Sequence, residues 1–158
     1  MPRTSPSEIK GVDRDVVFAI TERLLHNYLL PRDCPRVTYY AKPDSLQSDI
    51  EKFFGQTTAE FVIVVENNWH DSIQNTTVYC YEFSPENFLL VDEGAGYYVS
   101  YEPVSPIKGS PMLNPISELL KRNVELRFTP KLWLLADQII KSSLQYSLIR
   151  MRNALPDK

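Results

Sequence analysis

The residue with the clearest chemical potential in this chain is Glu102, which follows an aromatic run and precedes two prolines. Within GAGYYVSYEPVSP, residues 94–106, the pattern of 96–101 alternates like a strand, and Pro103 and Pro106 cannot donate to a sheet ladder. We therefore predict that Glu102 lies at a strand end, where its carboxylate opens toward a cleft. The alternative is a solvated acid beside a turn.

The other residues with chemical potential each have a plain structural interpretation. Arg32 and Asp33, in PRDCPRV, could clamp a phosphate, but adjacent opposite charges in a turn more often bond to the backbone of their own loop. His26 and His70 have no neighbouring Ser or Cys that suggests a catalytic triad. We expect these four residues to serve structure rather than catalysis.

The two cysteines, Cys34 and Cys80, do not have the spacing of a metal site, and only two histidines could assist them. We expect no metal ion and two reduced thiols. The sequence shows no signal peptide and no apolar run near the ~18 residues that cross a bilayer. A cytoplasmic protein without membrane contact is the resulting expectation.

Length and charge restrict the class of protein. The 158 residues are 43% hydrophobic and 23% charged, which suits one globular domain with one core. A formal net charge of −3 argues against a nucleic-acid-binding protein, because such proteins need a basic face to displace counterions from phosphates.

The elements that must position Glu102 alternate between strand and helix. Strands are predicted over 16–20, 36–41, 60–66, 77–83, 88–91, 96–102 and 124–128, with 60–66 the most apolar and therefore central. Helices are predicted over 22–30 after a Thr21 cap, 44–55 ending at Gly55, 67–73, 115–123 after an Asn114 cap, and 131–149. The last is the longest, with a core-facing stripe of Leu132, Leu135, Ala136, Ile139, Ile140 and Leu144.

This order predicts an α+β fold. Residues 1–15 form a loose lead-in, and residues 16–155 form a single domain with a curved or split, mainly antiparallel sheet flanked by helices. The 96–102 strand is expected to pair with 60–66 or 77–83, because its tyrosines and valine need a sheet face. No glycine-rich phosphate loop is present among only five glycines.

Over almost all of residues 16–155 the chain resembles an uncharacterised bacterial family of unknown function. The matching segments are PRDCPRV (31–37), EKFFGQTTA (51–59), AGYYVSYEPVSP (95–106), VELRFTPKLW (124–133) and IRMRNA (149–154). Members of that family begin with a strand that carries a His-Phe-Ser motif, whereas MPRTSPSEIKGVD lacks histidine. The resemblance implies either a start truncated before that strand or divergence there.

A more distant resemblance links VVFAITERLLHNYL and YYVSYEPVSP to ADP-ribosyltransferase-like proteins. It implies an ADP-ribosyltransferase-like fold with NAD as a substrate rather than a tightly bound cofactor, and Glu102 as the catalytic glutamate. A carboxylate suits that role because positive charge builds on the anomeric carbon as nicotinamide leaves. The same resemblance implies NAD-contacting roles for Phe18, Thr21, Arg32 and Ser100. The family's first-strand histidine has no counterpart here, which would make such an enzyme degenerate.

Two function hypotheses therefore stand. The first is an NAD-dependent ADP-ribosyltransferase-like protein that acts through Glu102. The second is a non-catalytic domain that binds a small ligand or a protein partner, with Tyr97, Tyr98 and Tyr101 as a contact surface. The position of Glu102 relative to Phe18 discriminates between them.

Overall fold

The computed structural model of the chain describes residues 1–4 and 12–157, and it divides the chain into two compact units. Unit 1 combines Met1–Leu25 with Tyr79–Met112, and unit 2 combines His26–Val78 with Leu113–Lys158. Strands and helices occur together along the chain, so the predicted α+β class is confirmed. The chain folds into separate open sheets rather than one.

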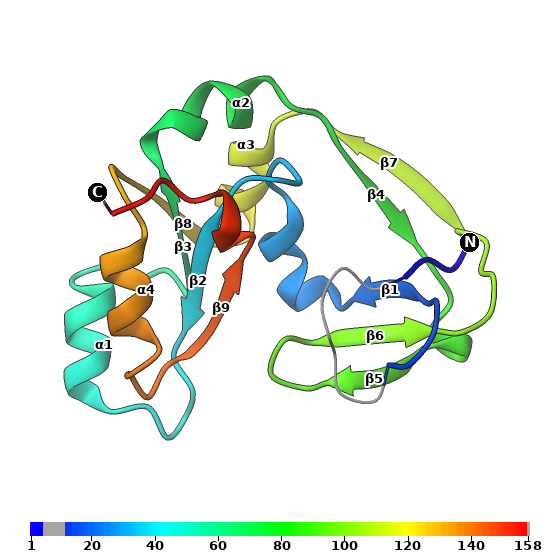
Figure 1. Cartoon of the computed structure of the whole chain (residues 1–158), viewed down its shortest axis with the longest axis horizontal. Helices are drawn as coiled ribbons and strands as arrows, with labels where there is room; N and C mark the ends of the chain where they lie inside the picture. Colours follow the sequence, from blue (N-terminus) through cyan, green and yellow to red (C-terminus); the bar gives the residue numbers. More distant parts are fainter. Residues whose placement is uncertain (5–11, 158) are drawn as a thin grey trace. The chain divides into compact units, whose positions relative to one another are not determined.

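Unit 1 is built on a three-stranded antiparallel sheet (Figure 1). In spatial order its strands are β1 (Val17–Ile20), β6 (Tyr97–Ser100) and β5 (Leu89–Asp92). A two-stranded sheet pairs β4 (Val78–Glu82) with β7 (Lys108–Met112), and the 3-10 helix η3 (Pro85–Asn87) precedes β5. The sequence did not predict β7, because KGSPM contains glycine and proline, which are rare inside strands.

The predicted lead-in, residues 1–15, lies partly outside the described residues. Its described beginning is tied to the start of the first strand, since Arg3 and Val16 exchange two backbone hydrogen bonds of 2.9 and 3.0 Å.

The predicted partners of β6 are wrong, because β6 pairs with β1 and β5. A tight turn joins β5 to β6: the Asp92 carboxylate accepts a 2.9 Å hydrogen bond from the Ala95 amide, and Gly96 adopts φ +66°. A Cβ on Gly96 would lie 2.5 Å from Leu24 Cδ1, so this position requires glycine. Pairing with β5 through this turn closes a shorter loop than pairing with the 60–66 strand would, whereas the pairing with β1 joins residues more than 75 positions apart.

Unit 2 contains a four-stranded mixed sheet. In spatial order its strands are β8 (Val124–Thr129), β3 (Phe61–Glu66), β2 (Arg36–Tyr40) and β9 (Gln145–Ile149). β3 is central as predicted, and all six of its residues are buried. The β3–β8 pair is parallel, and the other two pairs are antiparallel.

The helices α1 (Gln47–Phe54) and α4 (Trp133–Ile139) lie against one face of this sheet (Figure 1). The remaining helices are η1 (Glu22–Tyr28), η2 (Asn67–Trp69), α2 (His70–Asn75), α3 (Pro115–Lys121) and η4 (Met151–Asn153). Two cap predictions are confirmed: the Asn114 side chain accepts a hydrogen bond from the Ser117 amide, and Gly55 ends α1 at φ +66°. The predicted helix over 22–30 is the 3-10 helix η1, whose residues are divided between the two units.

The predicted long helix over 131–149 is wrong, because α4 ends at Ile139 and the chain returns as β9. The Ser142 hydroxyl donates a 2.7 Å hydrogen bond to the Ile139 carbonyl, which uses an acceptor that a longer helix would need. Residues 145–149 then pair along the whole length of β2. Tertiary pairing with an unfilled sheet edge thus outweighed the helical pattern.

The core of unit 2 lies between the sheet and its two covering helices. Its buried members are Val37, Tyr39, Phe53, Phe54, Val62, Val64, Leu132, Ala136, Ile139 and Leu144. Most of the predicted stripe is therefore confirmed, but Ile140 is 45% exposed. Leu46, which the amphipathic pattern placed inward, is 60% exposed because it precedes α1 instead of belonging to it.

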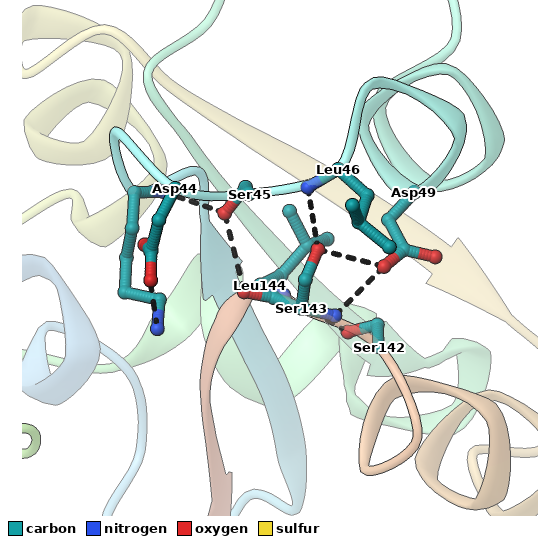
Figure 2. A network of polar contacts seen from close by, with 8 residues as sticks. Asp44, Ser45, Leu46, Asp49, Ser142, Ser143 and Leu144 are labelled. Atoms are coloured by element: carbon teal, nitrogen blue, oxygen red, sulfur yellow. Dashed lines mark hydrogen bonds and ion pairs between the residues drawn. The ribbon is translucent and has the colours of Figure 1, made fainter.

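A polar network secures the start of α1 to the turn before β9 (Figure 2). The Leu46 amide donates to Ser143 Oγ at 2.7 Å, and one Asp49 carboxylate oxygen accepts from both the amide and the hydroxyl of Ser143, each at 2.7 Å. These hydrogen bonds, the Ser143 amide first, hold the pKa of Asp49 below its ordinary value. The start of α1, which has no side-chain cap of its own, is thus held by Ser143, a residue almost a hundred positions away.

Truncation of the α4 stripe tests this core. We expect Leu132→Ala and Ile139→Ala each to lower the free energy of unfolding by about 2–5 kcal/mol, because both side chains are fully buried. Leu134→Ala is the matched control on the same helix, where a 70% exposed side chain predicts a loss below about 0.5 kcal/mol. Urea denaturation checks all three, and equal losses at the three positions would contradict the assigned face.

The Asp49 network predicts an acid-dependent loss of stability. Because the pKa of Asp49 is lower in the folded than in the unfolded chain, its contribution is present above the ordinary value of about 3.9 and disappears as the pH falls through the folded value. We expect Asp49→Asn to be less stable than the wild type at pH 7 and to approach it below about pH 4. Urea denaturation across this range measures the gap, with Asp137→Asn, an exposed carboxylate of α4, as the control for net charge. A gap that does not change with pH would contradict this role.

Candidate functional site

The candidate site is organised around Arg127, which lies on β8 opposite Val64 of β3. Its guanidinium reaches the end of α1, where Nη1 donates to the Phe53 carbonyl at 2.6 Å and Nη2 donates to the Phe54 carbonyl at 2.8 Å. These carbonyls belong to the last turn of the helix and have no intrahelical partner. A cation there satisfies the carbonyls and complements the helix dipole.

Tyr39 on β2 completes this contact. Its hydroxyl donates to the Phe53 carbonyl at 2.9 Å and accepts from Arg127 Nη1 at 3.1 Å. Burial raises the pKa of Tyr39 to about 12, so the hydroxyl keeps its proton and remains a donor at neutral pH. Arg127 and Tyr39 together fix the end of α1 over β2, β3 and β8.

The charge of Arg127 is balanced from its own strand. Glu125, two residues earlier and therefore on the same face, accepts from Arg127 Nε at 2.7 Å. That hydrogen bond is the largest cause that lowers the pKa of Glu125. Four of the five guanidinium N–H groups are thus accounted for by described partners.

An open cavity of about 310 Å³ lies beside this contact. It is lined by Tyr39, Lys52, Phe53, Val64, Arg127, Phe128, Thr129, Leu135 and Gln138. Three of these residues, Arg127, Phe128 and Thr129, end β8 at the carboxyl edge of the parallel β3–β8 pair. Ligands in open sheets with parallel strands are commonly bound outside the carboxyl ends of those strands.

The residues predicted from the sequence do not line this cavity, and three of them lie on or just after the paired strands β1 and β6 of unit 1. Phe18 pairs with Val99, and Ser100 pairs with Val17, so residues more than 80 positions apart lie on adjacent strands. Ser100 is buried, and its hydroxyl both donates to the Glu102 carbonyl at 3.0 Å and accepts from the Glu102 amide at 3.2 Å. Glu102 itself is exposed in a bend just after β6, so it follows a strand end as predicted, and its exposure matches the alternative of a solvated acid beside a turn.

Thr21 lies at the other end of this strand pair, and Arg32 belongs to unit 2. Thr21 follows β1 at the end where Ile20 pairs with Tyr97, whereas Glu102 follows β6 at the end where Ser100 pairs with Val17. The paired stretch between them is about 10 Å long at about 3.4 Å per residue, and both residues lie beyond it. Arg32 is an exposed turn residue of unit 2.

The arginine that organises the PRDCPRV loop is Arg36 rather than Arg32. Arg36 is 2% exposed, and its guanidinium donates to the carbonyls of Asn27 at 2.8 Å, Cys34 at 2.8 Å and Pro31 at 3.3 Å. The exposed Asp33 contributes its carbonyl to the Asn153 side chain at 2.7 Å. The Arg36 side chain and the Asp33 carbonyl thus hold this loop in place.

The cysteines are thiols rather than disulfides. Cys34 is fully buried, and burial raises its pKa to about 11, so it is a poor nucleophile at neutral pH. Within residues 1–4 and 12–157 no three His, Cys, Asp or Glu side chains gather in a way that could hold a metal ion. No helix of this part of the chain has both the length and the apolar character to cross a bilayer.

The sequence did not predict that Tyr39, Lys52 and Gln138 line a cavity. Tyr39 lies within a strand pattern, and Lys52 and Gln138 lie within amphipathic helix patterns, so none of the three stands out as a binding residue. A signal did exist for Arg127: Glu125 and Arg127 have opposite charges two residues apart in a strand, which places them on one face. The partners of this pair in α1 could not be inferred without the fold.

Comparison with known proteins gives a family but no activity. Residues 1–154 match a family of unknown function, DUF6886, and the chain belongs to that family. The expected membership of an uncharacterised family is thereby confirmed. No curated protein and no solved structure matches the chain.

Proposed function

We propose that this member of the DUF6886 family is a non-catalytic protein that binds a small ligand in the cavity between α1, α4 and the end of β8. The cavity is the observation that carries the proposal. Its volume of about 310 Å³ falls at the lower end of the range for small-molecule sites, which extends from about 300 to 1,000 Å³.

The lining has the composition of a binding site. Phe53, Val64 and Leu135 provide apolar surface, while Lys52 and Gln138 provide polar groups from two different helices. Ligand sites are mostly apolar, with a few polar groups that fix orientation.

The site is also held in place before any ligand arrives. The Arg127 and Tyr39 hydrogen bonds fix one end of α1, and the Ser143 network fixes the other. Preorganisation of this kind reduces the conformational entropy that binding must offset. The proposal requires no catalytic residue, since the polar groups of the lining serve to orient the ligand.

A second candidate function is an ADP-ribosyltransferase-like activity on NAD in unit 1. The pairing of β1 with β6 favours it, because this pairing puts Phe18 and Ser100 on adjacent strands and leaves Glu102 exposed just after the strand end. Phe18 pairs with Val99, so its side chain and that of Ser100 project from opposite faces of the sheet. In that role Glu102 would stabilise the positive charge of the ribosyl centre, and NAD would contact one of these two faces. Thr21 would take part only through a substrate that extends along β1, and Arg32 belongs to unit 2.

A blocked cavity tests the first function. We expect a fragment screen by two-dimensional NMR to find small ligands that shift the amides of Lys52, Thr129 and Gln138. Gln138→Trp should weaken these ligands at least about tenfold by filling the space, whereas Gln74→Trp, on the exposed surface of α2, should change affinity less than about twofold. Ligands that bind both variants equally would contradict a site in this cavity.

Substitution of Glu102 tests the second function. If the protein acts on NAD, Glu102→Gln should leave NAD affinity nearly intact and lower NAD hydrolysis by about a hundredfold or more, because the carboxylate acts on the transition state. Glu93→Gln, an exposed acid in the turn before β6, is the matched control. Direct titration and an NAD hydrolysis assay measure the two quantities. Absence of NAD binding by the folded wild-type chain would exclude this activity.

A further inference from the structure

We propose that the ligand of this cavity is a small organic anion, a carboxylate with a compact apolar body, whose charge pairs with the ammonium group of Lys52. This inference rests on the proposed small-ligand function and names the chemical class of the ligand. The cavity offers such a ligand a cationic lining with apolar surface beside it.

The lining is cationic although the whole chain is acidic. Lys52 and Arg127 both line the cavity, and no lining residue is an acid. The formal net charge of the chain is −3, so this grouping runs against the average composition. A cavity lined by one sign of charge favours a ligand of the opposite sign.

The two cations differ in whether a carboxylate of the protein already pairs with them. Arg127 is paired with Glu125 and holds the end of α1, so its role is to shape the cavity. Lys52 has no carboxylate within 4.0 Å among the described residues, and its Nζ lies 5.0 Å from the centre of the Phe53 ring. Because Phe53 lines the cavity, this contact keeps the ammonium group beside the ligand space.

The acids that share α1 with Lys52 make their closest contacts with other groups. Asp49 accepts hydrogen bonds from the amide and the hydroxyl of Ser143, and Glu51 accepts a 3.1 Å hydrogen bond from the Gln47 side chain. The charge of Lys52 also helps to keep the pKa of Asp49 low, after these hydrogen bonds, but the two side chains form no ion pair within 4.0 Å. Lys52 is therefore the cation of the lining that can receive an external carboxylate.

The rest of the lining indicates what the anion carries. Phe53, Val64 and Leu135 suit an apolar body, and the Gln138 amide, which has no described side-chain hydrogen bond, can donate to a second carboxylate oxygen. The Tyr39 hydroxyl already donates to Phe53 and accepts from Arg127, so it is engaged with protein partners. A compact aromatic or branched aliphatic carboxylate fits these requirements.

The test compares three probes of one shape and different charge: benzoate, benzamide and benzylamine, each titrated against the full chain by two-dimensional NMR. We expect benzoate to shift the amides of Lys52, Thr129 and Gln138 and to bind at least about tenfold tighter than benzamide, with benzylamine weakest. Lys52→Gln should weaken benzoate about tenfold and leave benzamide unchanged. Lys141→Gln, an exposed lysine in the turn after α4, is the matched control and should change neither.

Three other outcomes would contradict an anionic ligand, and they distinguish this inference from the more general proposal that the cavity binds a small ligand. Benzamide that binds in the cavity as tightly as benzoate means that the cavity takes ligands without selecting anions. Equal weakening of benzoate by Lys52→Gln and Lys141→Gln means that only the overall charge matters. Benzoate that fails to bind up to about 10 mM also overturns it, and the fragment screen on the Gln138→Trp variant then shows independently whether the cavity binds another class.

Discussion

The guanidinium of Arg127 is the contact on which the arrangement of unit 2 depends. It joins the last carbonyls of α1 to β8, with the Tyr39 hydroxyl as the connection to β2. Hydrogen bonds that involve a charged group contribute about 1.5–3 kcal/mol each, more than neutral ones. Because α1 covers the buried face of the sheet and Arg127 also lines the cavity, this side chain holds the end of the helix that Gly55 terminates beside the cavity.

Several polar side chains of unit 2 form hydrogen bonds with backbone groups that lack a partner in a helix or sheet. Arg36 donates to the carbonyls of Asn27, Pro31 and Cys34, and Ser143 accepts from the Leu46 amide at the start of α1. The fully buried Glu66 accepts from the Leu155 amide at 3.0 and 3.1 Å. Buried backbone groups without partners are costly, so each of these side chains allows an irregular segment to be packed against the sheet.

In unit 1 the position of Glu102 after a strand was predicted correctly, but this position alone does not define a reaction. Glu102 follows the end of β6, and Phe18 and Ser100 lie on adjacent strands, but the register places their side chains on opposite faces of the sheet. A transferase site also needs groups that hold the substrate on both sides of the reacting bond. Thr21 lies beyond the opposite end of the β1–β6 pair, so the strands alone do not gather the groups that such a site requires.

The sequence by itself determined the elements whose signals are local. The apolar run of β3, the Asn114 cap, the glycine at the end of α1 and the α+β class all follow from residues within a few positions of each other, which fix backbone propensity and burial. It also placed Glu102 after a strand, because prolines close by end regular pairing.

Tertiary structure decided everything that requires a distant partner. Residues 145–149 form a strand because they pair along β2, and β6 lies between β1 and β5. The start of α1 is held by Ser143, almost a hundred positions away. The cavity belongs to the same class, since Lys52, Arg127 and Gln138 come from three elements. The physical reason is that periodicity reports which face of an element is apolar, whereas pairing and side-chain contacts depend on which elements meet.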